Sequence, residues 1–318
     1  MHLVQSMAYA GATPWHGIGT SLSPHQPIEV WAREAGMDWR IESSNVCFVA
    51  GTSRLGALHP FPGQKVLYRS DTKAPLSVVS DRYQVVQPAE ILEFYRDLIE
   101  AGGFELETAG VLKEGRKLWA LARTGQSVTL KRKDRVEGYL LLATACDGTL
   151  ATTAQFTSVR VVCHNTLALA LGRGQGAVKV PHRSQFDPDK VKLELGLAVS
   201  SWGDCTDRIK ALADCHVRPK AVEAYFRQVL KLPASNGNRN ARPARTLKAM
   251  HELFHGRGMG SDLASADGTT WGLVNSVTEF VDHHRRARSH DHRLDAAWFG
   301  QGASFKQRAW DEALKLVA

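Results

Sequence analysis

The chain has 318 residues, of which 43% are hydrophobic and 23% charged, and these values are typical of a packed protein and exclude a largely disordered one. Its formal net charge of +8 and its pI near 9.3 predict attraction to polyanions such as nucleic acid or an acidic membrane surface. The charge is unevenly distributed, because residues 110–185 contain 12 Lys and Arg against 4 Asp and Glu. That surplus of 8 equals the net charge of the whole chain.

Five cysteines, an odd number with no Cys-x-x-Cys pair, are typical of reduced thiols in a cytosolic protein. The sequence has no run of about 18 apolar residues that would cross a bilayer. Its first residues also lack the charged and then apolar layout of a signal peptide. We therefore expect a cytoplasmic protein with no membrane partner.

The first 60 residues are rich in Gly, Pro and Trp, and they predict an irregular N-terminal lead-in with one short helix from Ile28 to Ala35. Two runs of β-branched and aromatic residues follow, KVLYRSD and PLSVVSDRYQVVQ, separated by a turn at Thr72 to Pro75. Such runs on either side of a turn predict a β-hairpin.

A helix is predicted to begin at Pro88, where PAEILEFYRDLIEAGG places apolar residues at helical spacing until Gly102 and Gly103 end it. After it, segments that alternate or run apolar are separated by Gly and Asp-Gly turns up to about residue 165. They predict an antiparallel β-meander, and NTLALALG predicts the start of a second helix.

From about residue 186 the pattern is helical to the end of the chain, apart from the polar break ASNGNRNARP. The sequence thus predicts an α+β fold in which helices flank an antiparallel β-meander and a helical C-terminal region follows. We expect three segments: the lead-in of residues 1–60, an α+β basic core of residues 61–185 that binds nucleic acid, and the helical region of residues 186–318.

The strongest local signal for function is a basic hairpin tip. It places four cations within five residues, and such charges repel one another unless water or a polyanion neutralises them. Further cations occur in the neighbouring strands and in the Gly-rich stretch after the meander, where an antiparallel sheet would align them along one side. The predicted nucleic-acid-binding residues are Lys131, Arg132, Lys133, Arg135, Arg160, Arg173, Lys179, Arg116 and Lys117. The alternatives are an ordinary charged turn and scattered, solvated charges.

Signals for catalysis are weak by comparison. Cys163 and His164 are adjacent, and neighbouring residues of a strand point to opposite faces, so they do not form a nucleophilic dyad with each other. We expect Asn165 or Thr166 to cap the predicted second helix and Cys163 to lie in the core. Neither GRGQG nor HGRGMGSD has the pattern of a phosphate-binding loop. We therefore expect no enzyme activity and no cofactor.

The histidines of DHHRRARSHDH invite a metal site built on His283, His290 and His292. Metal ligands on helices need a spacing that brings them onto one face, and these residues do not satisfy it on one helix, although His290 and His292 would pair in a loop. The interleaved Arg285, Arg286, Arg288 and Arg293 would repel a cation. A basic helix end is the favoured interpretation, and a metal-dependent nucleic-acid-processing enzyme is the alternative.

Four motifs occur in an order that resembles a family of phage- and plasmid-encoded proteins of unknown function. They are AGATPWHGIG, SDRYQVVQ, VRVVCHNTL and GTTWGLVNSVTEFVDHH, and the resemblance covers nearly the whole chain. The order of helix, antiparallel meander and second helix, together with the basic charge, is similar to the core of single-strand annealing recombination proteins. That likeness implies a homo-oligomeric ring or filament whose basic groove holds single-stranded DNA.

These observations together predict a single-stranded DNA-binding protein that serves as a single-strand annealing or recombination mediator of a phage or plasmid. Phosphate contacts would immobilise the strand, so no nucleophile or metal is required. Trp271, Leu273, Val277 and Phe280, at near-helical spacing, would serve subunit contacts or core packing. A regulatory or anti-defence protein that binds a host protein is a further alternative.

Overall fold

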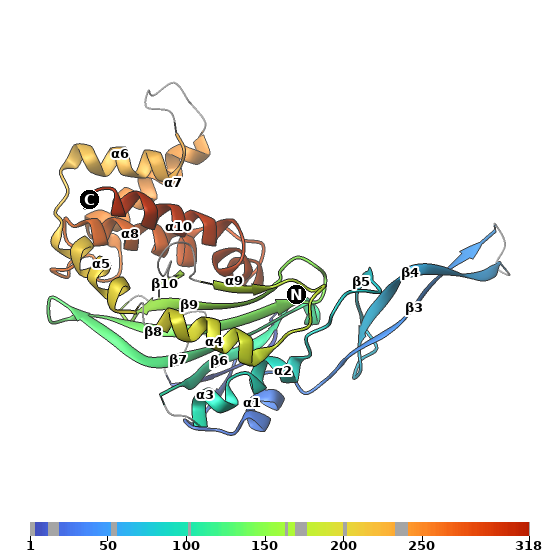
Figure 1. Ribbon diagram of the computed structural model, residues 1–318. Helices are drawn as coiled ribbons and strands as arrows, with labels where there is room; N and C mark the ends of the chain where they lie inside the picture. Colours follow the sequence, from blue (N-terminus) through green and yellow to red (C-terminus); the bar gives the residue numbers. More distant parts are fainter. Residues whose placement is uncertain are drawn as a thin grey trace. The chain divides into compact units, whose positions relative to one another are not determined.

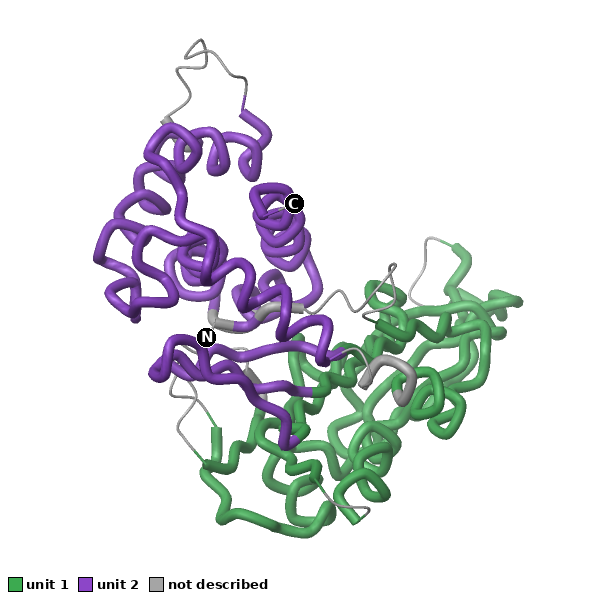
Figure 2. Tube along the Cα trace, turned by 60° about the vertical axis from the view of Figure 1, so that its left-hand side comes forward, with its two compact units in different colours: residues 1–124, 140–155, 177–195 green, residues 125–139, 156–176, 196–318 purple. Residues whose placement is uncertain are grey.

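The structure is a computed structural model (Figure 1). It describes residues 4–11, 19–51, 56–100, 103–162, 165–168, 177–199, 202–232 and 241–317. The chain forms two compact units, each built from ranges that are not consecutive in sequence (Figure 2). Unit 1 contains residues 1–124, 140–155 and 177–195, and unit 2 contains residues 125–139, 156–176 and 196–318. The two units therefore cut across the three consecutive segments that the sequence predicts.

The larger sheet has the strand order β10-β9-β8-β7-β6-β1-β2, and β11 also pairs with β9. Its central strands β6 to β9 follow one another in sequence and in the sheet, which confirms the predicted meander. Strands β1 and β2 pair in parallel, whereas the pairs β1–β6, β6–β7, β9–β10 and β9–β11 are antiparallel. The bounds are β1 Val4–Ala10, β2 Thr20–Leu22, β6 Glu105–Leu112, β7 Lys117–Leu130, β8 Asp134–Ala145, β9 Thr152–Arg160, β10 Asn165–Ala168 and β11 Ala177–Val180.

The N-terminal segment is more regular than its composition predicts. Helix α1 (Ile28–Glu34) confirms the predicted short helix, but the irregular lead-in is wrong, because β1, β2 and β3 also lie there. Strands β3 (Ile41–Ala50), β4 (Ala57–Arg69) and β5 (Pro75–Ser80) form a second antiparallel sheet in unit 1 (Figure 1). The predicted β-hairpin corresponds to strands β4 and β5 of this sheet. Strand β3 and the first part of β4 were not predicted. These strands are largely exposed, so they contain polar residues and prolines that are not typical of a strand pattern.

The helix predicted from Pro88 is present but interrupted. Helix α2 (Pro88–Glu93) begins with a capping box between Gln87 and Glu90, and α3 (Arg96–Glu100) follows after a turn. Tyr95 lies in that turn, fully buried, with its hydroxyl 2.9 Å from the Ala120 carbonyl oxygen and 3.0 Å from that of Leu140. The interruption therefore places the tyrosine hydroxyl within hydrogen-bond distance of two backbone carbonyl oxygens of the sheet, which share its single proton.

The second helix predicted at NTLALALG is wrong, because the structure forms β10 there and β11 after it. Asn165 of β10 pairs with Arg160 of β9, and Thr166 donates its backbone N–H to the Asp282 carboxylate at 2.9 Å instead of capping a helix. The alternation of leucine with small residues has the two-residue period of a strand. Cys163, His164 and Arg173, and most of AGATPWHGIG and ASNGNRNARP, lie outside the described residues.

The predicted helical C-terminal region is confirmed. Its elements are α4 Pro188–Val199, α5 Trp202–Asp214, α6 Pro219–Val229, α7 Ala241–Glu252, the π-helix Leu253–Arg257, α8 Thr270–Glu279, the π-helix Phe280–His284, α9 His290–Trp298 and α10 Gln301–Leu314. Every residue of α8 is buried, and α5 and α10 pack against it within unit 2. Trp271, Leu273 and Val277 therefore serve core packing. No helix among the described residues has the length and apolarity needed to span a bilayer.

Candidate nucleic-acid interface

The net positive charge of the chain is concentrated in one of its two units. The ranges of unit 2 contain 24 Lys and Arg against 15 Asp and Glu, a net charge of +9, whereas those of unit 1 contain 16 against 17, a net charge of −1. A count along consecutive residues cannot show this division, because unit 2 combines part of the meander with the C-terminal helices. The folded chain thus presents one basic unit and one nearly neutral unit.

The tip of the β7–β8 hairpin belongs to unit 2 and is a strained turn (Figure 1). The Lys133 N–H donates to the Leu130 carbonyl oxygen at 3.1 Å, and the two central residues, Lys131 and Arg132, have φ angles of 43° and 72°. Two positive φ values identify a type I′ turn, whose preferred residues are Asn-Gly. A longer L side chain in the left-handed region costs on the order of 1 kcal/mol. The hairpin therefore carries cations where other residues would be more stable.

Only part of this basic tip is neutralised by carboxylates. Lys131 forms an exposed ion pair with Asp214 of α5, and Arg135 lies 3.0 Å from Glu137. The Arg132 and Lys133 side chains are exposed, and neither contacts a carboxylate in the described part of the chain. The turn thus presents two cations that remain available to a ligand, beside two that are held in exposed or half-exposed pairs.

Arg160 does not belong to an exposed groove, which corrects its predicted role. Its side chain is 3% exposed, and its Nε lies 2.8 Å from the Asp134 carboxylate, which is 1% exposed. The guanidinium also donates to the carbonyl oxygens of Met259 and Gly260. Ser265 and Trp271 donate to the same Asp134 carboxylate, at 2.6 and 3.1 Å. This buried network holds strands β8 and β9 against the helices of unit 2.

The remaining predicted cations belong to unit 1 or lie outside the described residues. Lys117 is buried, so its expected exposure to a phosphate backbone is wrong. Arg116 and Lys179 are exposed but belong to unit 1, and Arg173 lies outside the described residues. Of the nine predicted residues, Lys131, Arg132, Lys133 and Arg135 are the ones that the structure brings together on an exposed turn of the basic unit.

The C-terminal histidines do not assemble into a metal site among the described side chains, where no group of three ligating residues comes together. His292 Nδ1 lies 2.8 Å from the hydroxyl of Ser289, which caps α9, and His284 lies 3.6 Å from Glu279. The expected loop around His290 is the first turn of α9, and the side chain of His290 is outside the described residues. The interleaved arginines follow the second π-helix, in agreement with the predicted basic helix end.

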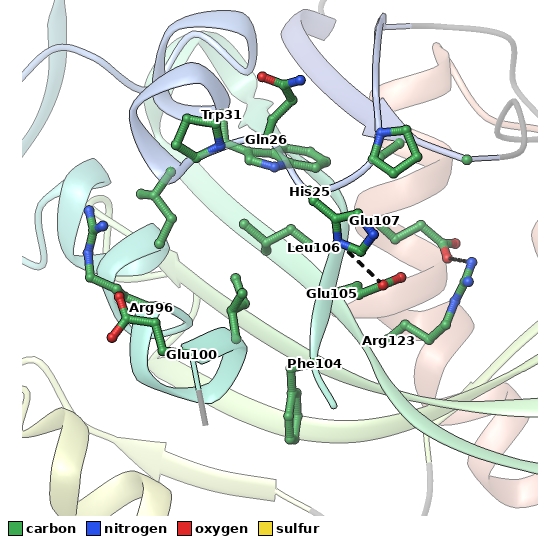
Figure 3. A pocket seen from close by; sticks show the side chains of 16 residues that line it. His25, Gln26, Trp31, Arg96, Glu100, Phe104, Glu105, Leu106, Glu107 and Arg123 are labelled. Atoms are coloured by element: carbon green, nitrogen blue, oxygen red, sulfur yellow. Dashed lines mark hydrogen bonds and ion pairs between the residues drawn. The ribbon is translucent and has the colours of Figure 1, made fainter. Parts of the chain in front are cut away.

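Unit 1 contains a pocket of about 370 Å³, and most of the charged side chains that line it are paired (Figure 3). Arg123 and Glu107, which both line the pocket, form an ion pair, and His25 Nδ1 lies 3.6 Å from Glu105. Arg96 is paired with carboxylates of α1 and α2. Because its lining residues include more carboxylates than guanidinium groups, the pocket disfavours a phosphate ligand. The polyanion site is therefore to be sought in unit 2.

Glu279, at the end of α8, is a buried carboxyl that accepts a hydrogen bond from the Met259 N–H, at 3.0 Å. Burial raises the pKa of Glu279, while that hydrogen bond and the neighbouring His284 oppose the rise. A raised pKa in the folded state means that the protonated form is favoured by folding. Glu279 therefore contributes stability below its unfolded pKa of about 4.3 and loses it as the pH rises through the folded pKa.

We expect Glu279→Gln to make the chain relatively more stable at pH 7 than at pH 4, because the amide carries no charge that burial penalises. The measurement is urea unfolding of both proteins at the two pH values. The difference in unfolding free energy, variant minus wild type, should be more positive at pH 7. A difference that does not change with pH, or that changes in the opposite direction, contradicts this account of Glu279.

Comparison with known proteins bears on the family and not on the activity. A family model described as a domain of unknown function, DUF932, matches residues 75–298. The match runs from the first residue of β5 to the last residue of α9 and includes residues of both units. No curated protein and no solved structure matches the chain. Because the matched range is well over half of the sequence, the chain belongs to the DUF932 family.

Proposed function

We propose that this protein binds nucleic acid through the phosphate backbone, with single-stranded DNA as the expected ligand, and that unit 2 makes the contacts. The observation that carries the proposal is the gathering of the whole positive surplus in unit 2, +9 against −1 in unit 1. Phosphate contacts supply most of the sequence-independent affinity for nucleic acid, and they need cations that are exposed and not already paired. Binding of this kind involves no covalent step.

The strained hairpin tip supports the same proposal independently of the charge count. Backbone conformations that cost free energy are found preferentially at functional sites, where the side chain matters more than the stability of the turn. Here the strained positions are occupied by Lys131 and Arg132. A tip of this shape places cations at the end of a narrow two-stranded ribbon, where they can follow a strand backbone with little steric hindrance.

The homo-oligomeric annealing role and the phage or plasmid origin form the finer part of the proposal. They depend on the resemblance in motifs and in the order of elements. In this chain, the elements that carry the resemblance in order are the helices α2 and α3 and the meander β6 to β9. After β9 the order differs, since β10 and β11 stand where that resemblance implies a helix. For this reason the proposal of binding is argued from charge and turn geometry, and annealing of complementary strands is a separate outcome to test.

The proposal predicts that charge removal matters in unit 2 and not in unit 1. We expect Arg132→Ala/Lys133→Ala to weaken binding of a labelled single-stranded oligonucleotide about tenfold at low salt. The matched control is Arg116→Ala/Lys179→Ala, which removes two exposed cations from unit 1 and should change the affinity by less than about twofold. Fluorescence anisotropy with single-stranded and duplex oligonucleotides measures both. Equal losses in the two variants, or no binding by the wild type, would overturn the proposal.

A second variant tests the sign of the electrostatic effect. Asp214 neutralises Lys131 from α5, and both side chains are exposed. We expect Asp214→Ala to raise the affinity for the oligonucleotide about twofold to fivefold, because it frees a cation and removes a negative charge beside the turn. The same anisotropy titration measures the change. An affinity that falls, or stays the same, means that nucleic acid does not approach the hairpin tip.

A further inference from the structure

A second cationic feature of unit 2 lies far along the sequence from the hairpin tip. Arg285 and Arg286 follow the π-helix Phe280–His284, and Arg293 lies in α9. The three side chains, together with His292, line one small pocket of about 120 Å³ whose other lining residues are apolar. None of the described residues that line it is acidic. The pocket is therefore a concave surface that is cationic on its polar side.

The cations of this pocket are the guanidinium groups of arginine, which are planar and present several N–H donors each. Guanidinium groups that share so small a space repel one another unless an anion lies between them. Two of them each donate a hydrogen bond to an uncharged oxygen. Arg285 donates to the side-chain amide oxygen of Gln301 at 3.1 Å, and Arg293 donates to the carbonyl oxygen of His283. These bonds hold the guanidinium planes in place.

Size and chemistry together select the ligand. The pocket volume is about four times the roughly 30 Å³ of a liquid water molecule, which suits a small oxyanion. Guanidinium groups present paired N–H donors that match the oxygens of a phosphate. The pocket also adjoins the first turn of α9, whose N-terminal backbone dipole favours negative charge.

We propose that this pocket, lined by Arg285, Arg286, Arg293 and His292, binds a phosphate monoester dianion. Two sources carry that chemistry: the terminal phosphate of a nucleic-acid strand and a free nucleotide. The pocket would bind inorganic phosphate in either case, so this inference does not depend on the function proposed for the hairpin tip. It adds an anion site of defined ligand chemistry to the basic unit.

The test uses neighbouring arginines of the same segment. Arg286 is exposed and lines the pocket, whereas Arg288 is exposed and does not. Thermal unfolding of the full chain is followed as sodium phosphate replaces sodium chloride at constant ionic strength. We expect phosphate to raise the unfolding midpoint of the wild type and of Arg288→Ala alike, and to bind Arg286→Ala about tenfold more weakly.

Comparison of the two variants removes the general stabilising effect of phosphate on proteins, which acts on both equally. Equal rises of the unfolding midpoint in Arg286→Ala and Arg288→Ala, or no rise beyond that in chloride, would overturn the proposal that the pocket binds phosphate. Oligonucleotides with a 5′-phosphate or a 5′-hydroxyl then identify the source. Tighter binding of the phosphorylated strand by Arg288→Ala, but not by Arg286→Ala, supports a strand end. Competition of a nucleoside monophosphate with inorganic phosphate, with both strands bound alike, supports a free nucleotide.

Discussion

Replacing the two central residues of the β7–β8 turn by its preferred pair, Lys131→Asn/Arg132→Gly, is expected to stabilise the protein and to weaken nucleic-acid binding at the same time. Asparagine and glycine adopt positive φ with little cost, so the unfolding free energy should rise by about 1 kcal/mol. The exposed ion pair of Lys131 with Asp214, which is lost, contributes less than that. Removal of two cations should weaken oligonucleotide binding about tenfold at low salt.

Opposite changes in stability and affinity are the informative result, because a variant that simply misfolds loses both. Urea unfolding and fluorescence anisotropy on the same preparations measure the two quantities. A second variant, Lys131→Asn alone, should show a smaller change of each. If the double variant is more stable and binds as tightly as the wild type, the strained cations are not part of the interface.

Loss of the buried carboxylate of Asp134 is expected to have the largest effect on stability of any substitution discussed. Asp134→Ala takes the Asp134 carboxylate away from the buried Arg160 guanidinium, and it removes the acceptor of Ser265 and Trp271. Breaking one side of a buried ion pair costs about 3–5 kcal/mol. That amount is a large fraction of the total stability of a typical domain.

Asp214→Ala is the matched control, because it also removes an aspartate that pairs with a cation of the same unit, but at the surface. We expect it to cost less than about 1 kcal/mol. Replacing both partners of the buried pair, Asp134→Leu with Arg160→Met, should recover part of the loss, since neither partner is then left buried alone, while Glu279 loses the favourable charge of Arg160. Chemical unfolding of the three variants distinguishes them. Similar losses for Asp134→Ala and Asp214→Ala would contradict the buried network.

Strong local signals predicted much of the fold. The helix start at Pro88, the meander from Glu105 and the amphipathic C-terminal helices each combine a period with a clear beginning or end. The predictions that were wrong concern segments that become strands by pairing with a neighbouring strand of the chain. The sequence of β10 predicted a capped helix, but the strand pairs with β9. The sequence of β3 predicted an irregular segment, but the strand pairs with β4. Strand pairing decides the conformation of such segments, and in β10 the alternation of leucine with small residues is the local pattern that indicates a strand.

The sequence predicted the hairpin turn of the candidate site, but it did not predict which other cations lie on the same unit. Two strands joined by KRKDR identify a basic hairpin tip, and the structure confirms that it is exposed. Burial of Arg160 follows from its partner Asp134, which lies 26 positions earlier in the chain. The division of charge between the units depends on which ranges pack together. The arginine-lined pocket required the fold of the segment after α8, since the same residues read only as a basic helix end.

The central claim is that exposed cations of unit 2 replace counterions along a nucleic-acid backbone. Its most direct test is the slope of log affinity against log salt concentration for single-stranded DNA, measured for the wild type and for Arg132→Ala/Lys133→Ala. Each phosphate contact contributes about 0.7 to the slope for a single strand, so the variant should lose about 1.4. A wild-type affinity that does not depend on salt, or a slope that the substitutions leave unchanged, would contradict the account.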